Sequence, residues 1–137
     1  MPINADLLRD NFELVLQRDQ VFPRRFYEIL FARRPEVQPL FTRNSASAQH
    51  ALLAQTLMAA LDHADEPAWL TEKLAPLGAQ HAAYGVTAEM YQGVGDALIA
   101  AIAEVSAADW TDELQAAWTE AYWALVSIMC PSAHPSR

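Results

Sequence analysis

Apolar residues recur every three or four positions in one stretch of this chain after another, and this period constrains the fold more than any other feature. The first stretch begins at Ala5 and contains Leu8, Phe12, Val15 and Leu16. Side chains at this spacing share one face of an α-helix and bury together. With 137 residues, 53% of them hydrophobic, and only 4 Gly, the chain suits one helical core better than a turn-rich β fold or a disordered chain. We therefore predict an all-α fold.

Prolines set the boundaries of the next elements. Pro23 falls in the first turn of a second helix, where its missing N–H does no harm. That helix must end by Arg34, because the residue before Pro35 is pushed out of the α region. Pro35 and Pro39 leave the following segment, which includes Phe41, no more than a turn or two of helix.

The middle of the chain reads as two helical regions. A small polar linker, Thr42–Ser47, leads into a long amphipathic helix over about Ser47–Ala64. Pro67 and Pro76 bracket a shorter helical piece, and the chain then continues to a break at Tyr84–Gly85. We expect Pro76 to interrupt the helix there.

Two better specified helices follow. Thr87 and Thr111 are predicted as their N-caps, since acids follow each of them in the first turn. The expected inner faces of the two helices carry these residues: Tyr91, Val94, Leu98, Ile99 and Ile102, then Leu114, Trp118, Tyr122, Leu125 and Met129. One domain is thus predicted over residues 1–130, with a disordered tail over 131–137.

Charge and composition exclude several classes of partner. The net charge of −8 would repel phosphate backbones and anionic membranes, so nucleic acid is not an expected partner. The most apolar stretch, Leu98–Ala103, is far shorter than the roughly 20 residues that span a bilayer, and we expect no membrane segment. A single cysteine, Cys130, cannot form an intrachain disulfide, and the N-terminus has no signal-peptide pattern. We expect a cytoplasmic protein.

The charge is unevenly distributed. Seven Arg stand against six acids through Arg43, which leaves two basic and eleven acidic residues for the remainder. This split marks either a docking face or ordinary solvated helix surfaces.

Several catalytic motifs are missing. The chain has no glycine-rich phosphate loop, no cysteine cluster, no HExxH and no GxSxG. None of the histidines has a partner four residues away, which excludes a zinc site within one helix; they are His50, His63, His81 and His134. A functional histidine would therefore act alone or across helices. Taken alone, His81 is an ordinary surface or core residue.

The chain resembles the globin family in four strings: PEVQPLF at 35–41, LGAQHAAYGV at 77–86, YQGVGDAL at 91–98 and AAWTEAYWAL at 116–125. The closest likeness is to bacterial single-domain globins and the haem domain of flavohaemoglobins, in consistent order over roughly 7–129. The resemblance implies a globin fold, a three-on-three helical sandwich around a pocket for haem b.

By that resemblance, His81 is the proximal ligand of the haem iron. Its other ring nitrogen is expected to donate to the carbonyl of Leu77. Phe41 matches the phenylalanine that wedges against the porphyrin, and Pro35 the proline that opens the short helix. Corner packing is the alternative for both. Four further residues match positions that line the haem, and would otherwise count as core: Val86, Tyr91, Val94 and Leu98.

On the distal side the resemblance points to Tyr27, Gln49 and Leu53, with the tyrosine and the glutamine stabilising a bound ligand. The choice of Gln49 as the distal residue of its helix has an alternative, because His50 is adjacent to it. Gln49 is favoured, since it puts Leu53 four residues on, whereas His50 would put the small Ala54 there. His50 is then expected at the pocket mouth, in solvent or, like Arg43, near a haem propionate. For Tyr27 the alternative is an ordinary core tyrosine.

The chain departs from flavohaemoglobins in two ways. It carries no flavin or nicotinamide motif, so any reductase is expected to be a separate protein. The glutamate that joins the family's proximal tyrosine and histidine has no counterpart, because residues 131–137 contain no acid. The proximal imidazole is thus expected to push less electron density onto iron.

The implied function is reversible, high-affinity O2 binding, for storage, transport or scavenging. NO dioxygenation with an external reductase is a second outcome of the same pocket, which would make the protein an enzyme, and CO is a further expected ligand. The alternatives are a globin sensor or signalling module, with or without haem, and a six-coordinate electron-transfer haem protein, should His50 or Tyr27 bind the iron.

Overall fold

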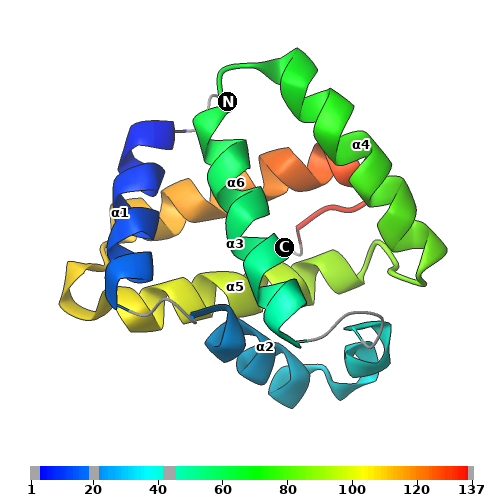
Figure 1. Ribbon diagram of the computed structural model, residues 1–137, viewed down its shortest axis with the longest axis horizontal. Coiled ribbons are helices and arrows are strands. Elements are labelled where there is room, and N and C mark those ends of the chain that lie inside the picture. Colours follow the sequence, from blue (N-terminus) through cyan, green and yellow to red (C-terminus); the bar gives the residue numbers. More distant parts are fainter. Residues whose placement is uncertain (1–3, 19–21, 42–45, 136–137) are drawn as a thin grey trace.

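The structure is a computed structural model that describes residues 4–18, 22–41 and 46–135, except for the side chains of Ala46, Ser47 and Gln49. The described residues form six α-helices and two 3₁₀ helices, and no strand. The α-helices are α1 (Ala5–Arg18), α2 (Phe22–Arg33), α3 (Ala46–Asp62), α4 (Pro67–Ala83), α5 (Met90–Ser106) and α6 (Asp112–Met129) (Figure 1). The 3₁₀ helices are η1 (Pro35–Phe41) and η2 (Ala107–Asp109). The predicted all-α class is confirmed.

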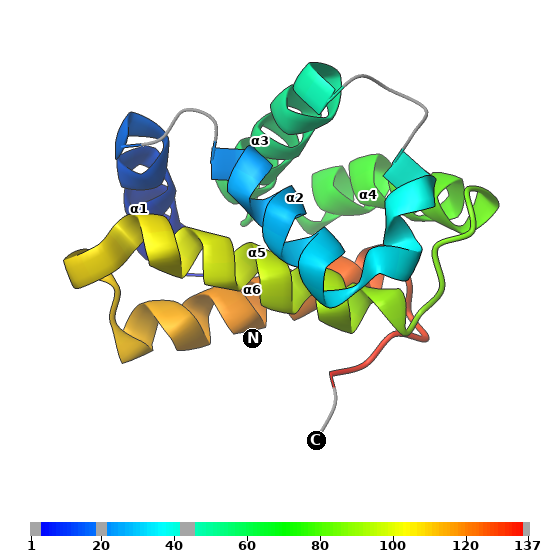
Figure 2. The same cartoon turned by 90° about the horizontal axis from the view of Figure 1, so that it is seen from below.

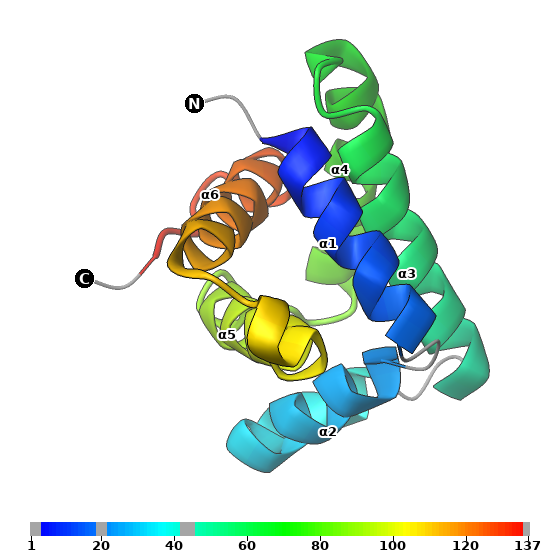
Figure 3. The same ribbon diagram turned by 90° about the vertical axis from the view of Figure 1, so that its left-hand side faces the viewer.

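The helices form two layers of three. Figure 3 shows α1, α3 and α4 on one side and α2, α5 and α6 on the other. Seen from below in Figure 2, α5 and α6 run side by side under α3 and α4. Contacts between α4 and α6, and between α1 and α5, join the layers. None of the described helices has the length and apolarity that crossing a bilayer requires.

The main core lies where α1, α2, α5 and α6 meet. Its fully buried side chains include Leu8, Phe12, Leu30 and Ile102. A buried polar chain fastens three of these helices: Trp118 Nε1 donates to Asn11 Oδ1 at 2.8 Å, and Asn11 Nδ2 donates to Ser106 Oγ at 2.9 Å. Because every member is bonded, this polar chain fixes the packing of α1 on α5 and α6 without leaving a buried group unpaired.

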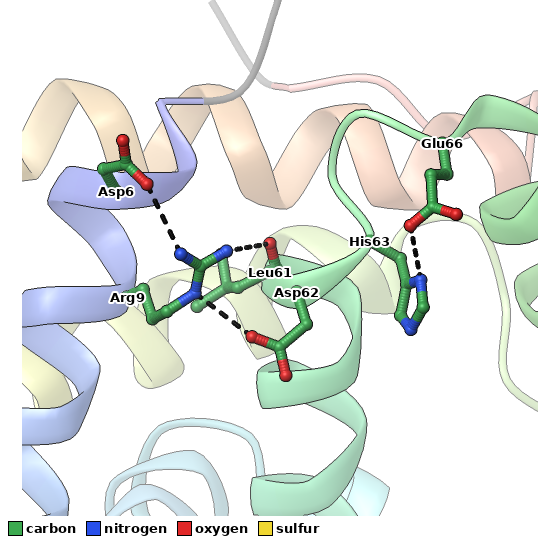
Figure 4. A network of polar contacts seen from close by, with 6 residues as sticks. All are labelled: Asp6, Arg9, Leu61, Asp62, His63 and Glu66. Atoms are coloured by element: carbon green, nitrogen blue, oxygen red, sulfur yellow. Dashed lines mark hydrogen bonds and ion pairs between the residues drawn. The ribbon is translucent and has the colours of Figure 1, made fainter.

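At the far end of α3, surface ion pairs tie this helix to α1 (Figure 4). Arg9 reaches Asp62 at 3.1 Å and Asp6 at 3.3 Å, and its guanidinium also donates to the carbonyl of Leu61 at 3.2 Å. In the turn that follows, His63 Nδ1 lies 2.6 Å from a carboxylate oxygen of Glu66. Such exposed pairs contribute little stability singly, and here they mark where α3 ends.

The predicted break at Pro76 is wrong, because α4 continues through it as one helix. Leu70 and Leu74 before the proline and Gly78 after it are all buried. At Gly78 the backbone lies so close to α6 that a methyl group would overlap the carbonyl of Met129. Burial of one continuous face against α6 therefore outweighs the hydrogen bond that the proline removes.

The two predicted N-caps have different outcomes. Thr111 is confirmed, since its hydroxyl accepts a hydrogen bond of 3.1 Å from the N–H of Leu114. Thr87 is wrong: α5 begins only at Met90, whose N–H bonds the Thr87 carbonyl in a preceding turn. The chain leaves α4 through Gly85 at φ = 100° and needs this extra turn before the next helix can start.

The segment after α6 is described as far as Pro135. Within it, Ala133 is only 6% exposed and packs in a small cluster with Tyr91 and Val126. The domain boundary at residue 130, and the disorder expected beyond it, stay predictions.

Candidate functional site

His81 occupies the last turn of α4 and is half-buried. Burial lowers the pKa of its imidazole below the ordinary value, since water no longer stabilises the charged ring. At neutral pH the ring is therefore uncharged, which is the form that binds a metal ion. No hydrogen bond joins it to the Leu77 carbonyl among the described residues, and that bond stays a prediction.

The ring of Tyr91, on α5, lies 6.4 Å from the ring of His81, centre to centre. Its backbone carbonyl accepts a hydrogen bond from the hydroxyl of Tyr122 on α6. Burial raises the pKa of both phenols, so each keeps its proton. The Tyr122 ring fits only because residue 95 is glycine, since a methyl group there would overlap it. These contacts anchor Tyr91 beside His81.

Tyr122 is the residue that sequence reasoning missed. The sequence places it only among the inward-facing residues of the last helix, whereas its hydroxyl bonds a residue 31 positions away. No local pattern signals such a contact, because it depends on how α5 and α6 pack.

Tyr27, on α2, lies among aromatic rings. Its ring centre is 5.8 Å from that of Phe31 and 5.4 Å from that of Phe41 in η1. Burial raises its pKa to about 12, so the hydroxyl is a hydrogen-bond donor at neutral pH. Within the described part of the chain that hydroxyl has no hydrogen-bond partner. Among the described residues it is a half-buried donor without a protein acceptor.

On α3, the ring of His50 stacks on that of Tyr27 at 5.3 Å and 20°. The structure thus places His50 against Tyr27, and its expected position at the pocket mouth stays a prediction. Gln49 lies in α3, but its side chain is outside the described part, as is the whole of Arg43. The choice of Gln49 over His50 as a distal donor stays a prediction.

The other candidate residues are apolar and come from several elements. Phe41, Leu53 and Val94 are half-buried against the main core, where Leu98 is buried. Leu77 belongs to a second cluster between α4 and α6. Val86 belongs to a third cluster with Tyr91. Helix α5 carries Val94 and Leu98 of the main core and Tyr91 of the third cluster. It therefore joins the part of the molecule around Tyr27 to the part around His81.

These residues fit haem. The set offers the uncharged imidazole of His81 and many apolar side chains, as a flat apolar macrocycle bound through one histidine needs. Nowhere in the described ranges do three or more His, Cys, Asp or Glu gather to hold a metal ion.

Comparisons with known proteins agree with this chemistry. A family model described as Globin matches residues 24–129. Flavohemoproteins of Bordetella pertussis and Bacillus anthracis are 30% identical over 125 residues and 33% identical over 119 residues. These alignments cover 90% and 85% of this chain, which spans only 31% and 29% of the relatives' length.

A solved structure is also similar. It is an engineered carbene transferase, a putative nitric oxide dioxygenase from Rhodothermus marinus, with a TM-score of 0.81 and 29% identity. The match covers 94% of this chain and 89% of that one.

Proposed function

This chain belongs to the globin family and has its all-α fold, and we propose that it binds haem b through His81 and takes up O2 reversibly and tightly. The observation that carries the proposal is the uncharged, half-buried imidazole of His81 beside Tyr91, in a molecule whose candidate pocket residues are otherwise almost all apolar. Haem held by His81 would supply an iron that takes up O2 or CO.

The protein's own residues would have separate roles in binding haem and its ligand. His81 would hold the iron, and Tyr91, anchored by Tyr122, would limit how its ring turns. The Tyr27 hydroxyl, protonated at neutral pH, would donate a hydrogen bond to the ligand. Phe41 and Leu53 would keep water out, which strengthens that bond.

The second part of the proposal is NO dioxygenation, which the names of the relatives suggest. In that reaction one NO and one O2 give one nitrate, and one electron restores the ferrous state. These 137 residues carry no flavin or nicotinamide motif, and we propose that a reductase outside them supplies the electron. Storage, scavenging and dioxygenation would share the same pocket.

Absorption spectra of the purified protein test the proposal. We expect a Soret band, a five-coordinate ferrous form and a stable O2 complex. Without a Soret band the proposal fails in favour of a haem-free module. A six-coordinate ferrous form would favour electron transfer, with His50, stacked on Tyr27, as the candidate sixth ligand.

Replacing the proposed ligand tests its identity. His81→Ala removes the one strong protein bond to iron, so purified protein should retain far less haem. Added imidazole should restore occupancy by filling the space. Full occupancy without imidazole would exclude His81 as the ligand.

Measuring NO consumption separates O2 binding alone from NO dioxygenation. One turnover with NO, in stopped flow, should be fast, whereas steady consumption on NADH should require an added reductase. Sustained turnover on NADH alone would show that electrons enter without a partner.

A further inference from the structure

A groove runs along the outer face of the α5–α6 pair, which lies side by side in Figure 2. Its cavity volume is about 320 Å³. We call it the α5–α6 groove, and its walls include Gln92, Asp96, Gln115, Thr119, Tyr122 and Trp123. Three of these are neutral polar side chains and two are aromatic, so the groove offers both hydrogen-bonding and apolar surface to a partner.

The charge around this groove has one sign. After Lys73 the chain has no Lys or Arg before Arg137, but seven acids. Asp96 lines the groove. Glu89 directly precedes α5 and stands seven residues, about two helical turns, before Asp96, and Asp112 stands one turn before Gln115 on α6. All three are exposed, and none forms an ion pair in the part of the chain that the structure describes.

Cations near α5 do not cancel this field. Arg25 of α2 pairs with Glu104 at 2.6 Å, and Arg34 lies beside Gly93 and pairs with Glu36 at 3.9 Å. Glu104 and Glu36 offset these two charges in part. Arg33 lines a neighbouring pocket with Ala100 and has no ion pair among the described residues, so one arginine stands against the three exposed acids named above. The charge that the groove presents to an approaching molecule is negative, and it selects a basic partner.

A chain of contacts leads inward from the groove wall. The ring of Trp123 packs against that of Tyr122 at 5.3 Å, edge to face. The Tyr122 hydroxyl bonds the Tyr91 carbonyl, and the Tyr91 ring lies 6.4 Å from that of His81. Three short steps thus connect the outer surface to the proposed haem ligand.

We propose that the α5–α6 groove is the docking surface of a basic one-electron donor protein, and that the electron passes inward by way of Trp123, Tyr122 and Tyr91 to the haem at His81. The proposal rests on the haem binding proposed above. The donor is oxidised by one electron and ferric haem is reduced by one. No bond or proton is exchanged.

A redox-inert cation tests the docking surface by itself. We would titrate the haem-containing protein, in a diamagnetic state, with hexaamminechromium(III) and follow the indole N–H signals of its 4 Trp by NMR. The Trp123 signal should broaden first. The double variant Glu89→Gln/Asp96→Asn should abolish this preference, while Glu72→Gln, which removes an exposed charge from α4, should preserve it.

Reduction kinetics test electron entry. Reduction of ferric protein by hexaammineruthenium(II), a cation, should slow about threefold in the double variant at 0.1 M ionic strength, and more at lower salt. Reduction by ferrous EDTA, an anion, should accelerate. Glu72→Gln should change neither rate. Tyr122→Phe, which removes the bond to Tyr91, should slow reduction by the cation without changing the broadening.

The outcomes are distinct. Equal broadening of all four indoles would overturn the docking surface, whether or not the protein binds haem. Selective broadening with unchanged reduction rates in the double variant, or in Tyr122→Phe, would overturn electron entry at the groove. If the protein lacks haem but the Trp123 signal still broadens selectively, the proposed function and electron entry are both contradicted. The groove would then remain a docking surface for a basic partner.

Discussion

At the scale of single residues, Tyr27 is where sequence and environment together define a chemical role. Its ring is held by Phe31, Phe41 and His50, while its hydroxyl has no hydrogen-bond partner among the described residues. In an ordinary core tyrosine the hydroxyl would be bonded to the protein. Stabilising a bound ligand requires a ring held in place and a hydroxyl that can donate to the ligand, and Tyr27 combines the two among the described residues.

Tyr27→Phe should therefore accelerate O2 dissociation by at least about tenfold, since about 1.4 kcal/mol of lost hydrogen bonding corresponds to that factor in the off-rate. Bound CO carries less negative charge than bound O2, so the CO dissociation rate should change less. Stopped-flow measurement of both gases checks this. The control is Phe31→Leu, which alters packing around the ring but removes no donor. Equal acceleration of both gases in Tyr27→Phe would indicate altered access instead.

The same burial makes an alkaline prediction. Burial raises the pKa of Tyr27 to about 12 in the folded protein, whereas the unfolded chain titrates near its ordinary value of about 10. Between these values the unfolded state has released the proton and the folded state has not, so the free energy of unfolding falls as pH rises. Urea unfolding of wild type and Tyr27→Phe across this range should show a steeper loss for wild type. Parallel curves would mean that Tyr27 titrates normally.

At the scale of elements, the spacing of apolar residues and the prolines predicted most helix boundaries. The end of α2 before Pro35 and the cap at Thr111 follow from local chemistry, and both are observed. The prediction at Pro76 is wrong because the proline removes one local backbone hydrogen bond, whereas the burial of α4 against α6 joins segments far apart in the chain. The prediction that α5 starts at Thr87 is wrong for a different reason: Thr87 can cap a helix, but the chain leaves Gly85 at a positive φ and makes a turn before the helix begins.

The closest approach between helices gives an element-scale prediction. Gly78→Ala would place a methyl group on the carbonyl of Met129, which is rigid backbone, so α4 and α6 must separate. We expect a loss of about 2 kcal/mol or more in the free energy of unfolding, within the usual cost of overpacking. Urea unfolding should show a lower midpoint at unchanged slope.

Gly93→Ala is the matched control, because the nearest atoms to its methyl group belong to the side chain of Arg34, which can move. There the better helix propensity of alanine should offset the contact and leave stability within about 1 kcal/mol. Equal losses in the two variants would mean that glycine matters at these positions for backbone reasons, and not for helix contact.

For the whole molecule, the family and the candidate proximal histidine could be proposed from the sequence, because short strings carry them, whereas Tyr27 lies outside those strings and was proposed from the resemblance as a whole. What joins them could not. The hydrogen bond from Tyr122 to Tyr91 and the stacking of His50 on Tyr27 link residues far apart in the chain. Such contacts are set by helix packing, which a period of apolar residues determines only in outline.

The distribution of burial over the whole molecule predicts how haem would act on stability. The main core binds α1, α2, α5 and α6 together, with fully buried residues on each. In contrast, among the described side chains of α3 the buried ones are Ala60 and Leu61, near its end, while Leu52 is 53% exposed. The buried residues of α4 are those that face α6. In the absence of haem, α3 and α4 should therefore be the least stable helices.

Haem that binds His81 on α4 and packs against Leu53 on α3 would add the contacts these two helices lack. A ligand at 1,000 times its Kd stabilises by about 4 kcal/mol, and amides that exchange only by local opening in α3 and α4 should gain most of it. Hydrogen exchange with and without haem should show large protection there and small changes in α1. His81→Ala should lose the added protection in α4. Uniform protection across all helices would mean that the haem-free chain opens as one unit.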